Sequence, residues 1–154
     1  MPDFVLSRLQ SSGVDPRKIC FEITETSAIS NWQQALSLIN LTREKGCRFA
    51  LDDFGTGLSS FAYLKKLPVD YVKIDGAFVS GIEGDQTNLA IVKSICEVAR
   101  STGKQTVAEF VDTPSAADLL QKIGVDYLQG YGIGKPEPID VLDAGGSIQE
   151  HQSA

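Results

Sequence analysis

Apolar residues recur along the chain in two alternating patterns. One is a short run rich in β-branched and aromatic residues, and the other is a longer segment with apolar residues at helical spacing. The short runs predict strands and the longer segments predict helices, with glycine or proline between many of them. The predicted strands cover 18–25, 48–53, 69–75, 105–109 and 125–129. The predicted helices cover 3–11, 30–45, 59–66, 86–101 and 114–123.

This alternation of strands and helices indicates the fold class. Strands that are joined by helices through short connections form a parallel sheet with right-handed crossovers. The sequence therefore predicts an α/β protein with about five βα units. Periodicity alone leaves two architectures open, an open doubly wound sheet and an arc of a (β/α)8 barrel. Residues 1–138 are expected to form one domain and the polar residues 139–154 a flexible tail.

Composition and charge narrow the possible functions. The chain has 154 residues with 20 acidic against 14 basic side chains, a net charge of -6, which argues against binding of duplex nucleic acid. No run approaches the roughly 18 apolar residues of a membrane span, so we expect a cytoplasmic protein without membrane contact. The only histidine, His151, lies in the polar tail, which argues against a histidine base. Cys20, Cys47 and Cys96 form no Cys-x-x-Cys pair and are expected to be buried free thiols.

Polar and charged side chains gather where the predicted strands end. They are Glu22, Asp52, Asp53, Lys73, Glu109 and Gln129. The carboxyl ends of parallel strands share one rim, so these side chains should lie close together. Clustered carboxylates repel one another unless a cation lies among them, and oxygen ligands favour Mg²⁺ or Mn²⁺. Such an ion polarises phosphoryl oxygens and lowers the pKa of bound water, and a nearby lysine stabilises phosphate charge.

Five motifs resemble, in order and spacing, those of the EAL-domain family. They are Phe-Glu-Ile-Thr-Glu at 21–25, Asp-Asp-Phe-Gly-Thr-Gly-Leu-Ser-Ser at 52–60, Val-Lys-Ile-Asp at 72–75, Val-Ala-Glu at 107–109 and Gln-Gly-Tyr at 129–131. Members of this family are bacterial phosphodiesterases that open cyclic di-GMP to linear pGpG. The resemblance covers roughly residues 4–138. It implies a TIM-type (β/α)8 barrel with the active site at the carboxyl ends of its strands.

The resemblance also implies roles for the strand-end residues. By position, Glu22 and Asp52 resemble metal ligands, and Asp53 resembles a ligand of a second metal ion or the holder of the attacking water. Lys73 resembles the lysine that orients water and contacts the phosphate, and Glu109 resembles a further acidic catalytic residue. The expected cofactor is Mg²⁺ or Mn²⁺, and the expected ligand is cyclic di-GMP.

Further positions resemble the rim and a loop of the family's active site. Gln129 and Asp112 correspond to rim residues that face the substrate. Four residues brace or form the loop through which the family couples dimerisation to metal binding, namely Glu25, Gly55, Thr56 and Gly57.

The chain also departs from the family pattern. The Glu-Ala-Leu signature and a metal-binding asparagine belong to barrel segments that would precede Met1, and a full barrel takes about 250 residues. Phe110 stands where the family has glycine, and Asp112 stands where it has glutamate. We therefore expect weak metal binding, little or no hydrolysis by this chain alone, and an oligomer or partner chain that covers the open barrel edges and an exposed apolar barrel interior. The alternatives are a degenerate binding, regulatory or protein-interaction module and a non-functional truncation product.

Overall fold

Five parallel strands form one sheet in the order β1-β2-β3-β4-β5 in the computed structural model, which describes residues 2–56 and 61–138. The strands are β1 (Cys20–Thr24), β2 (Arg48–Phe54), β3 (Tyr71–Ile74), β4 (Gln105–Ala108) and β5 (Tyr127–Leu128). This confirms the predicted α/β class. Strand order follows chain order without reversal, which is the arrangement of a barrel arc and differs from a doubly wound sheet. The predicted tail 139–154 lies outside the described residues.

The helices lie largely where the apolar spacing predicts them. They are α1 (Pro2–Ser12), α3 (Trp32–Arg43), α4 (Phe61–Lys66), α6 (Gln86–Ser101) and α7 (Pro114–Ile123). The first residues of the predicted helix 59–66 lie outside the described part of the chain. Shorter helical segments that the sequence analysis did not predict are η1 (Pro16–Lys18), α2 (Glu25–Ser30), α5 (Gly76–Val79) and η2 (Ile82–Gly84).

The segment around α2 corrects two predictions. The predicted strand 18–25 ends at Thr24, because the Thr24 hydroxyl accepts a hydrogen bond from the backbone N–H of Ser27 (3.3 Å) and begins a helix. Glu25 is therefore the first residue of α2 and does not close the strand. The predicted helix 30–45 begins later than expected, because Ser30 ends α2 and α3 follows Asn31.

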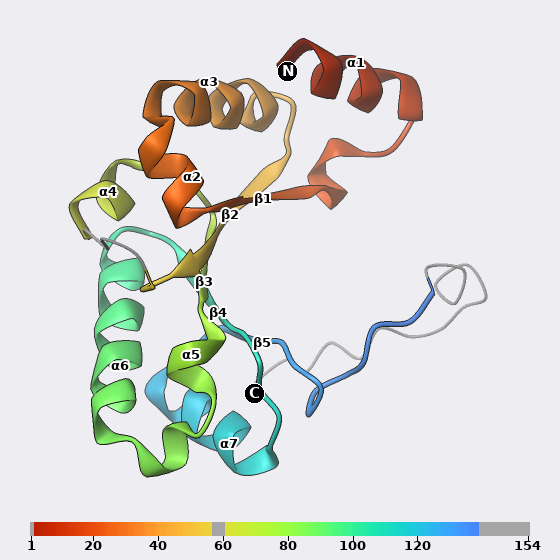
Figure 1. The fold of residues 1–154 in the computed structure, drawn as a ribbon. Coiled ribbons are helices and arrows are strands. Elements are labelled where there is room, and N and C mark those ends of the chain that lie inside the picture. Colours follow the sequence, from red (N-terminus) through yellow and green to blue (C-terminus); the bar gives the residue numbers. More distant parts are fainter. Residues whose placement is uncertain (1, 57–60, 139–154) are drawn as a thin grey trace.

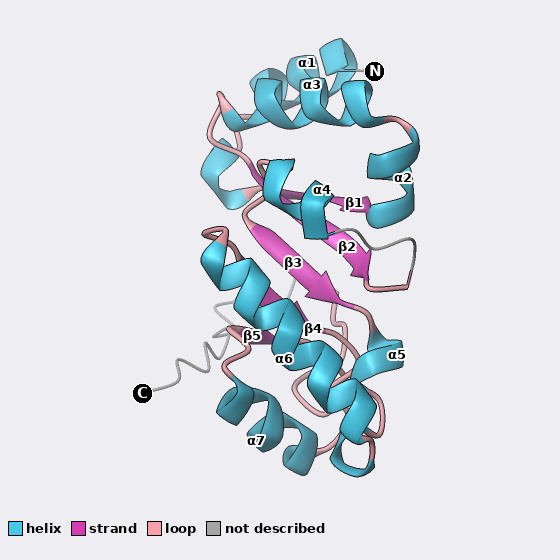
Figure 2. Cartoon of the chain, turned by 90° about the vertical axis from the view of Figure 1, so that its left-hand side faces the viewer, coloured by secondary structure: helices cyan, strands magenta, loops and turns pink. Residues whose placement is uncertain are grey.

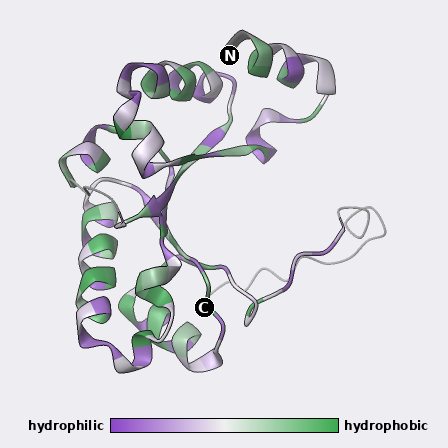
Figure 3. Cartoon of the chain, in the orientation of Figure 1, coloured by the Kyte–Doolittle hydropathy of each residue, from purple (hydrophilic) through white to green (hydrophobic). Residues whose placement is uncertain are grey.

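The helices α3, α4, α6 and α7 cover one face of the sheet (Figures 1 and 2). The core lies between these helices and the strand residues that point toward them, such as Phe49, Leu51, Val72 and Ile74. Figure 3 shows hydrophobic and hydrophilic residues alternating along α6, as expected for a helix with one buried side. The apolar side of the sheet thus packs against the helices, and this packing positions the strand ends.

The opposite face of the sheet is open and largely polar. It borders a hollow of about 380 Å³, lined by Cys20, Glu22, Arg48, Ala50, Tyr71, Lys73, Val107, Tyr127 and Gln129. The Arg48 guanidinium donates a hydrogen bond to the Tyr71 hydroxyl (2.6 Å), and the Gln105 amide donates one to the Tyr127 hydroxyl (3.3 Å). This inner face therefore differs from the apolar barrel interior that the sequence analysis expected.

The three cysteines differ in their exposure to solvent. Cys47 and Cys96 are buried free thiols, as predicted. Cys20 is also a free thiol, but it is exposed, because the period-2 alternation of β1 turns its side chain toward the open inner face. The expectation that all three thiols are buried was therefore wrong for Cys20.

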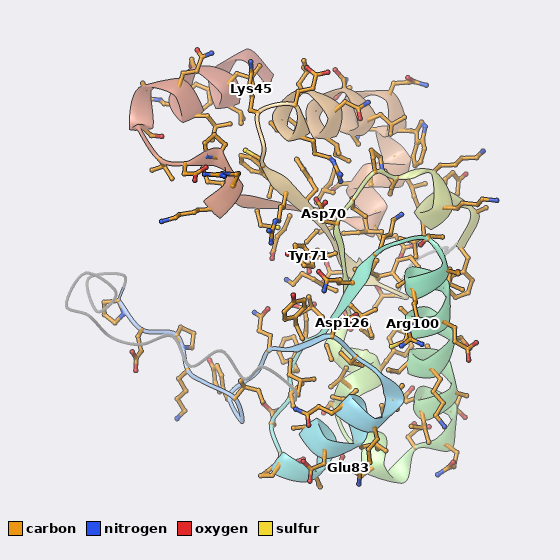
Figure 4. The ribbon with its side chains drawn as sticks, turned by 180° about the vertical axis from the view of Figure 1, so that it is seen from behind. Lys45, Asp70, Tyr71, Glu83, Arg100 and Asp126 are labelled. Carbon is orange, nitrogen blue, oxygen red and sulfur yellow. The ribbon has the colours of Figure 1, made fainter. Side chains whose placement is uncertain are left out.

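A short repeat ties the strands together at their amino ends. The sequence Val-Asp-Tyr occurs at 69–71 and again at 125–127. The first aspartate accepts a hydrogen bond from the backbone N–H of Phe49 (2.8 Å), and the second accepts one from the backbone N–H of Thr106 (2.7 Å). Figure 4 labels both aspartates and Tyr71 along the sheet. Each aspartate joins its own strand to the neighbouring strand and helps to set the register.

Among the described residues, none of the helices is both long enough and apolar enough to cross a membrane.

Candidate functional site

The end of β2 presents two adjacent carboxylates to the same rim. In a regular strand neighbouring side chains point to opposite faces, so Asp52 and Asp53 would diverge. Here the pairing of β2 with β3 shifts register between Leu51 and Phe54, and Asp53 has a left-handed backbone with φ 55°. This irregularity brings the two aspartates together with Glu109, since one carboxylate oxygen from each of the three lies within 4.8 Å of the others.

Lys73 of β3 lies at the centre of the strand-end cluster. Its Nζ is 2.8 Å from Oδ1 of Asp52, 2.9 Å from Oε1 of Glu109 and 3.1 Å from Oε2 of Glu22. The lysine side chain is only 7% exposed. Burial by itself would lower the pKa of Lys73, but the contacts with the three carboxylates outweigh it and raise the pKa above its usual value. Lys73 is therefore a fixed cation near neutral pH.

The two neighbouring acids have altered proton affinities. Burial raises the pKa of the Asp53 carboxyl, and the charges of Asp52 and Asp75 raise it further. Burial also raises the pKa of Glu109, against the opposing effect of Lys73. In both cases burial is the main cause, and the charges of neighbouring carboxylates add to it.

The acidic group fits a divalent metal ion. Asp52, Asp53 and Glu109 offer carboxylate oxygens, which Mg²⁺ and Mn²⁺ prefer. Oδ1 of Asp52 is buried, and its contact with Lys73 is an ion pair without hydrogen-bond geometry, so this oxygen has no hydrogen-bond partner among the described residues. A buried acceptor in this state suits a cation. Glu22 contacts Lys73 and is not one of the three acids in this group.

The two predicted rim residues differ in position. Gln129 directly follows β5 and borders the hollow beside Glu22 and Lys73. Its backbone N–H donates a hydrogen bond to Ala108 O (2.8 Å), which places it next to the end of β4. Asp112 is exposed, and within 2–56 and 61–138 it does not belong to the acidic group.

The loop after β2 is held by a side chain from the first residue of α2. Glu25 is buried, and its Oε2 accepts a hydrogen bond from the backbone N–H of Gly55 (3.2 Å). Gly55 has φ 109°, and a Cβ there would lie 2.6 Å from Cε2 of Phe78, so glycine is required on both grounds. The Thr56 hydroxyl donates to Asp53 O (3.0 Å). Gly57 lies outside the described residues.

Two features beside the site were not predicted from the sequence. Asp75 caps α5 by accepting a hydrogen bond from Ala77 N (2.7 Å), and its charge acts on Asp53. Phe110 is 63% exposed and has a left-handed backbone with φ 55°. The Asp-Gly pair at 75–76 is a turn signal that could have indicated α5. The glycine that the family has at position 110 could have indicated the backbone conformation of Phe110, because glycine is the usual residue at positive φ.

Comparisons with known proteins agree on one family. The sequence-family model of the EAL domain matches residues 1–136 of this chain. The chain is 47% identical over 139 residues to the cyclic di-GMP phosphodiesterase PdeB of Shewanella oneidensis. The aligned segment covers 90% of this chain and 16% of PdeB. The chain thus spans a small part of the length of this curated relative.

Solved structures give the same result. The EAL domain of Mycobacterium smegmatis DcpA superposes with a TM-score of 0.84 at 32% identity, over 93% of this chain and 64% of that one. A manganese and cyclic di-GMP complex of Klebsiella pneumoniae BlrP1 superposes with a TM-score of 0.80 at 30% identity, over 87% of this chain and 34% of that one.

Proposed function

Because the chain belongs to the EAL domain family, we propose that its acidic site is part of a metal-dependent phosphodiesterase site for cyclic di-GMP, with pGpG as the product. The observation that carries this proposal is the convergence of carboxylate oxygens from Asp52, Asp53 and Glu109 within 4.8 Å of one another, with the Lys73 ammonium paired to Asp52 and Glu109. The named activity of the relative PdeB and the metal-containing complex of BlrP1 support the same ligand and cofactor class.

Asp52, Asp53 and Glu109 would hold the ion, Mg²⁺ or Mn²⁺. When bound, such an ion polarises a phosphoryl oxygen and lowers the pKa of water. In the metal-free protein, burial raises the pKa of Asp53 and of Glu109, and the neighbouring carboxylates raise both further. A bound cation would favour the ionised forms of these acids, which are the forms that bind a metal ion.

Lys73 would serve as a cation and not as a base. Its raised pKa keeps the ammonium protonated near neutral pH, so it can donate hydrogen bonds to a phosphate oxygen or orient the attacking water. Glu22 contacts the same ammonium and would hold it in position. Gln129, which borders the hollow, would contact the ligand from the far strand.

The test is hydrolysis of cyclic di-GMP with Mn²⁺ or Mg²⁺, followed by separation of pGpG. We expect Asp52→Asn to lower the rate at least about 100-fold, because it removes the charge of a buried ligand oxygen. Asp118→Asn, on the exposed side of α7, should leave the rate unchanged. Equal rates for the Asp52 variant and the unaltered chain would refute the proposal.

A second candidate is a module that binds cyclic di-GMP without turnover. It is favoured by the three ion pairs of Lys73, which already engage carboxylates that a metal ion would need. Titration calorimetry would then show cyclic di-GMP binding, with no pGpG formed under any metal condition. Absence of both binding and turnover would contradict both candidates.

A further inference from the structure

Phe110 combines two unfavourable features in one residue. Its backbone has φ 55°, a region that residues with a bulky side chain rarely adopt. The residue is 63% exposed to solvent, so burial of its side chain compensates little for the strain. Strain of this kind persists where the surrounding structure enforces it, and such positions cluster at ligand-binding sites.

The surrounding structure holds the ring in one place. The ring lies directly on the backbone of Gly76, where an added Cβ would be 2.7 Å from Cγ of Phe110. On the other side, the backbone N–H of Val111 donates to Gln129 O (3.0 Å), and Gly132 N–H donates to Val111 O (2.9 Å). The aromatic side chain is therefore presented to solvent by fixed neighbours on α5 and after β5.

The same contacts place Phe110 beside the acidic site. Its chain neighbour is Glu109, which contacts Lys73. Its packing partner Gly76 follows Asp75, whose charge helps to raise the pKa of Asp53. Figure 1 shows α5 beside the segment that follows β4, where Phe110 lies. The exposed residue Phe110 therefore lies next in the chain to one of the three acids and packs on the residue that follows Asp75.

We propose that Phe110 is a stacking platform for one guanine base of the cyclic dinucleotide. The inference rests on the proposed function, because it needs a ligand with a base. Its physical basis is that a purine stacks on an aromatic face with a gain of about 5- to 100-fold in affinity. One side of the ring lies on Gly76, and the exposed side is available to the base.

The test measures cyclic di-GMP affinity by titration calorimetry in Ca²⁺ on the unaltered full chain and four variants. Phe110→Tyr keeps the flat ring and should bind within about 2-fold of the unaltered chain. Phe110→Leu keeps apolar bulk without the ring, and Phe110→Gly removes the side chain, so both should bind about 5- to 100-fold more weakly. Phe4→Leu is the matched control, because Phe4 is 62% exposed on α1, which Figures 1 and 2 place far from α5.

Melting temperatures separate binding from folding. Glycine adopts φ 55° without strain, so Phe110→Gly should melt above the unaltered chain even though it binds the ligand more weakly. A purely structural role for Phe110 predicts a lower melting temperature with unchanged affinity per folded molecule. That pairing of results would overturn the inference.

A second perturbation moves the ring without altering it. Gly76→Ala places a methyl group against Phe110 and should displace the ring, which weakens binding by a similar factor. In the Phe110→Gly background the same Gly76→Ala change meets no ring and should have little effect on affinity. Equal effects of Gly76→Ala in both backgrounds would contradict the proposed role of the ring.

The outcomes distinguish this inference from the proposed function. If the unaltered chain binds cyclic di-GMP and the Leu and Gly variants bind equally well, the stacking inference is wrong and the site assignment stands. If the unaltered chain does not bind the dinucleotide, both are wrong.

Discussion

At the scale of single residues, Lys73 decides the electrostatic balance of the site. Three carboxylates contact one ammonium that is 7% exposed, so the acids are partly neutralised before any metal ion binds. A buried charge that loses its partners is costly, because the groups left behind remain desolvated. The lysine is therefore both a structural cation and a competitor for the carboxylate oxygens.

Lys73→Met tests this double role. Without metal, we expect the free energy of unfolding to fall by about 2–4 kcal/mol, because Asp52, Glu109 and Glu22 lose their common cation. Mn²⁺ should raise the melting temperature of the variant more than that of the unaltered chain, because the ion replaces the missing charge. The measurement is thermal unfolding with EDTA and with Mn²⁺.

The control for this experiment is Lys104→Met. Lys104 is also a buried lysine, but its Nζ donates to Thr102 O (3.3 Å) and burial lowers its pKa. Its loss should not change the response to Mn²⁺. The same Mn²⁺ response for Lys73→Met and the unaltered chain would show that Lys73 and the metal do not compete.

At the scale of elements, the irregular end of β2 creates the site. The register shift between Leu51 and Phe54 and the left-handed backbone of Asp53 allow two adjacent carboxylates to share one rim. Aspartate and asparagine tolerate this backbone conformation better than most residues. This irregularity at the end of β2 therefore brings the negative charges of Asp52 and Asp53 together, which lowers the stability of the metal-free protein.

Asp53→Asn should stabilise the metal-free protein while weakening metal binding. The pKa of Asp53 is raised in the folded state, so folding becomes less favourable as pH rises from the unfolded value of 3.8 through the raised folded value. Asparagine lacks this titration. The melting temperature of the variant should exceed that of the unaltered chain by about 1–3 °C at pH 7, and the difference should vanish below pH 3.8.

Thermal unfolding between pH 3 and pH 8 in EDTA checks this prediction. Asp15→Asn is an informative contrast, because hydrogen bonds from Arg17 lower the pKa of Asp15 to about 2. Any stability that Asp15 contributes is present at neutral pH and is lost on acidification. The melting temperature of Asp15→Asn should therefore lie below that of the unaltered chain at pH 7, and this difference should shrink as the pH falls. An advantage of Asp53→Asn that is constant with pH would rule out ionisation as its cause.

At the scale of the whole molecule, the described sheet has two edges, β1 and β5, and an open inner face. Unpaired edges favour association with a further strand. The inner face carries Glu22, Arg48 and Lys73 and is less apolar than expected, so the edges are the stronger reason for association. The self-association or partner chain expected from the sequence remains a prediction.

Sedimentation equilibrium at micromolar concentration should show a mass above that of one chain. Cys20→Lys places a charge on the exposed edge strand β1 and should shift the equilibrium toward monomer, because edge lysines oppose strand pairing. Ser101→Lys, at the exposed end of α6, is the control and should not. A stable monomer of the unaltered chain would contradict the prediction of a homo-oligomer.

The amino-acid sequence was enough to predict the α/β class, the five strands, the long helices and the acids at the strand ends. These follow from period-2 and period-3.6 patterning and from local turn residues, which act within a few positions of the chain. The motifs also sufficed to identify the family, which the match over residues 1–136 confirms.

The way in which these acids meet follows from contacts between residues far apart in the chain. The contacts of Lys73 with Glu22 and Glu109 join residues 51 and 36 positions apart, and they depend on strand register. The bulge at Asp53 and the strained, exposed Phe110 depend on packing across the sheet and against Gly76, which no local pattern encodes. Local sequence therefore supplied the chemical groups, and long-range pairing supplied their geometry, because distances across a sheet depend on neighbouring strands and not on the chain between them.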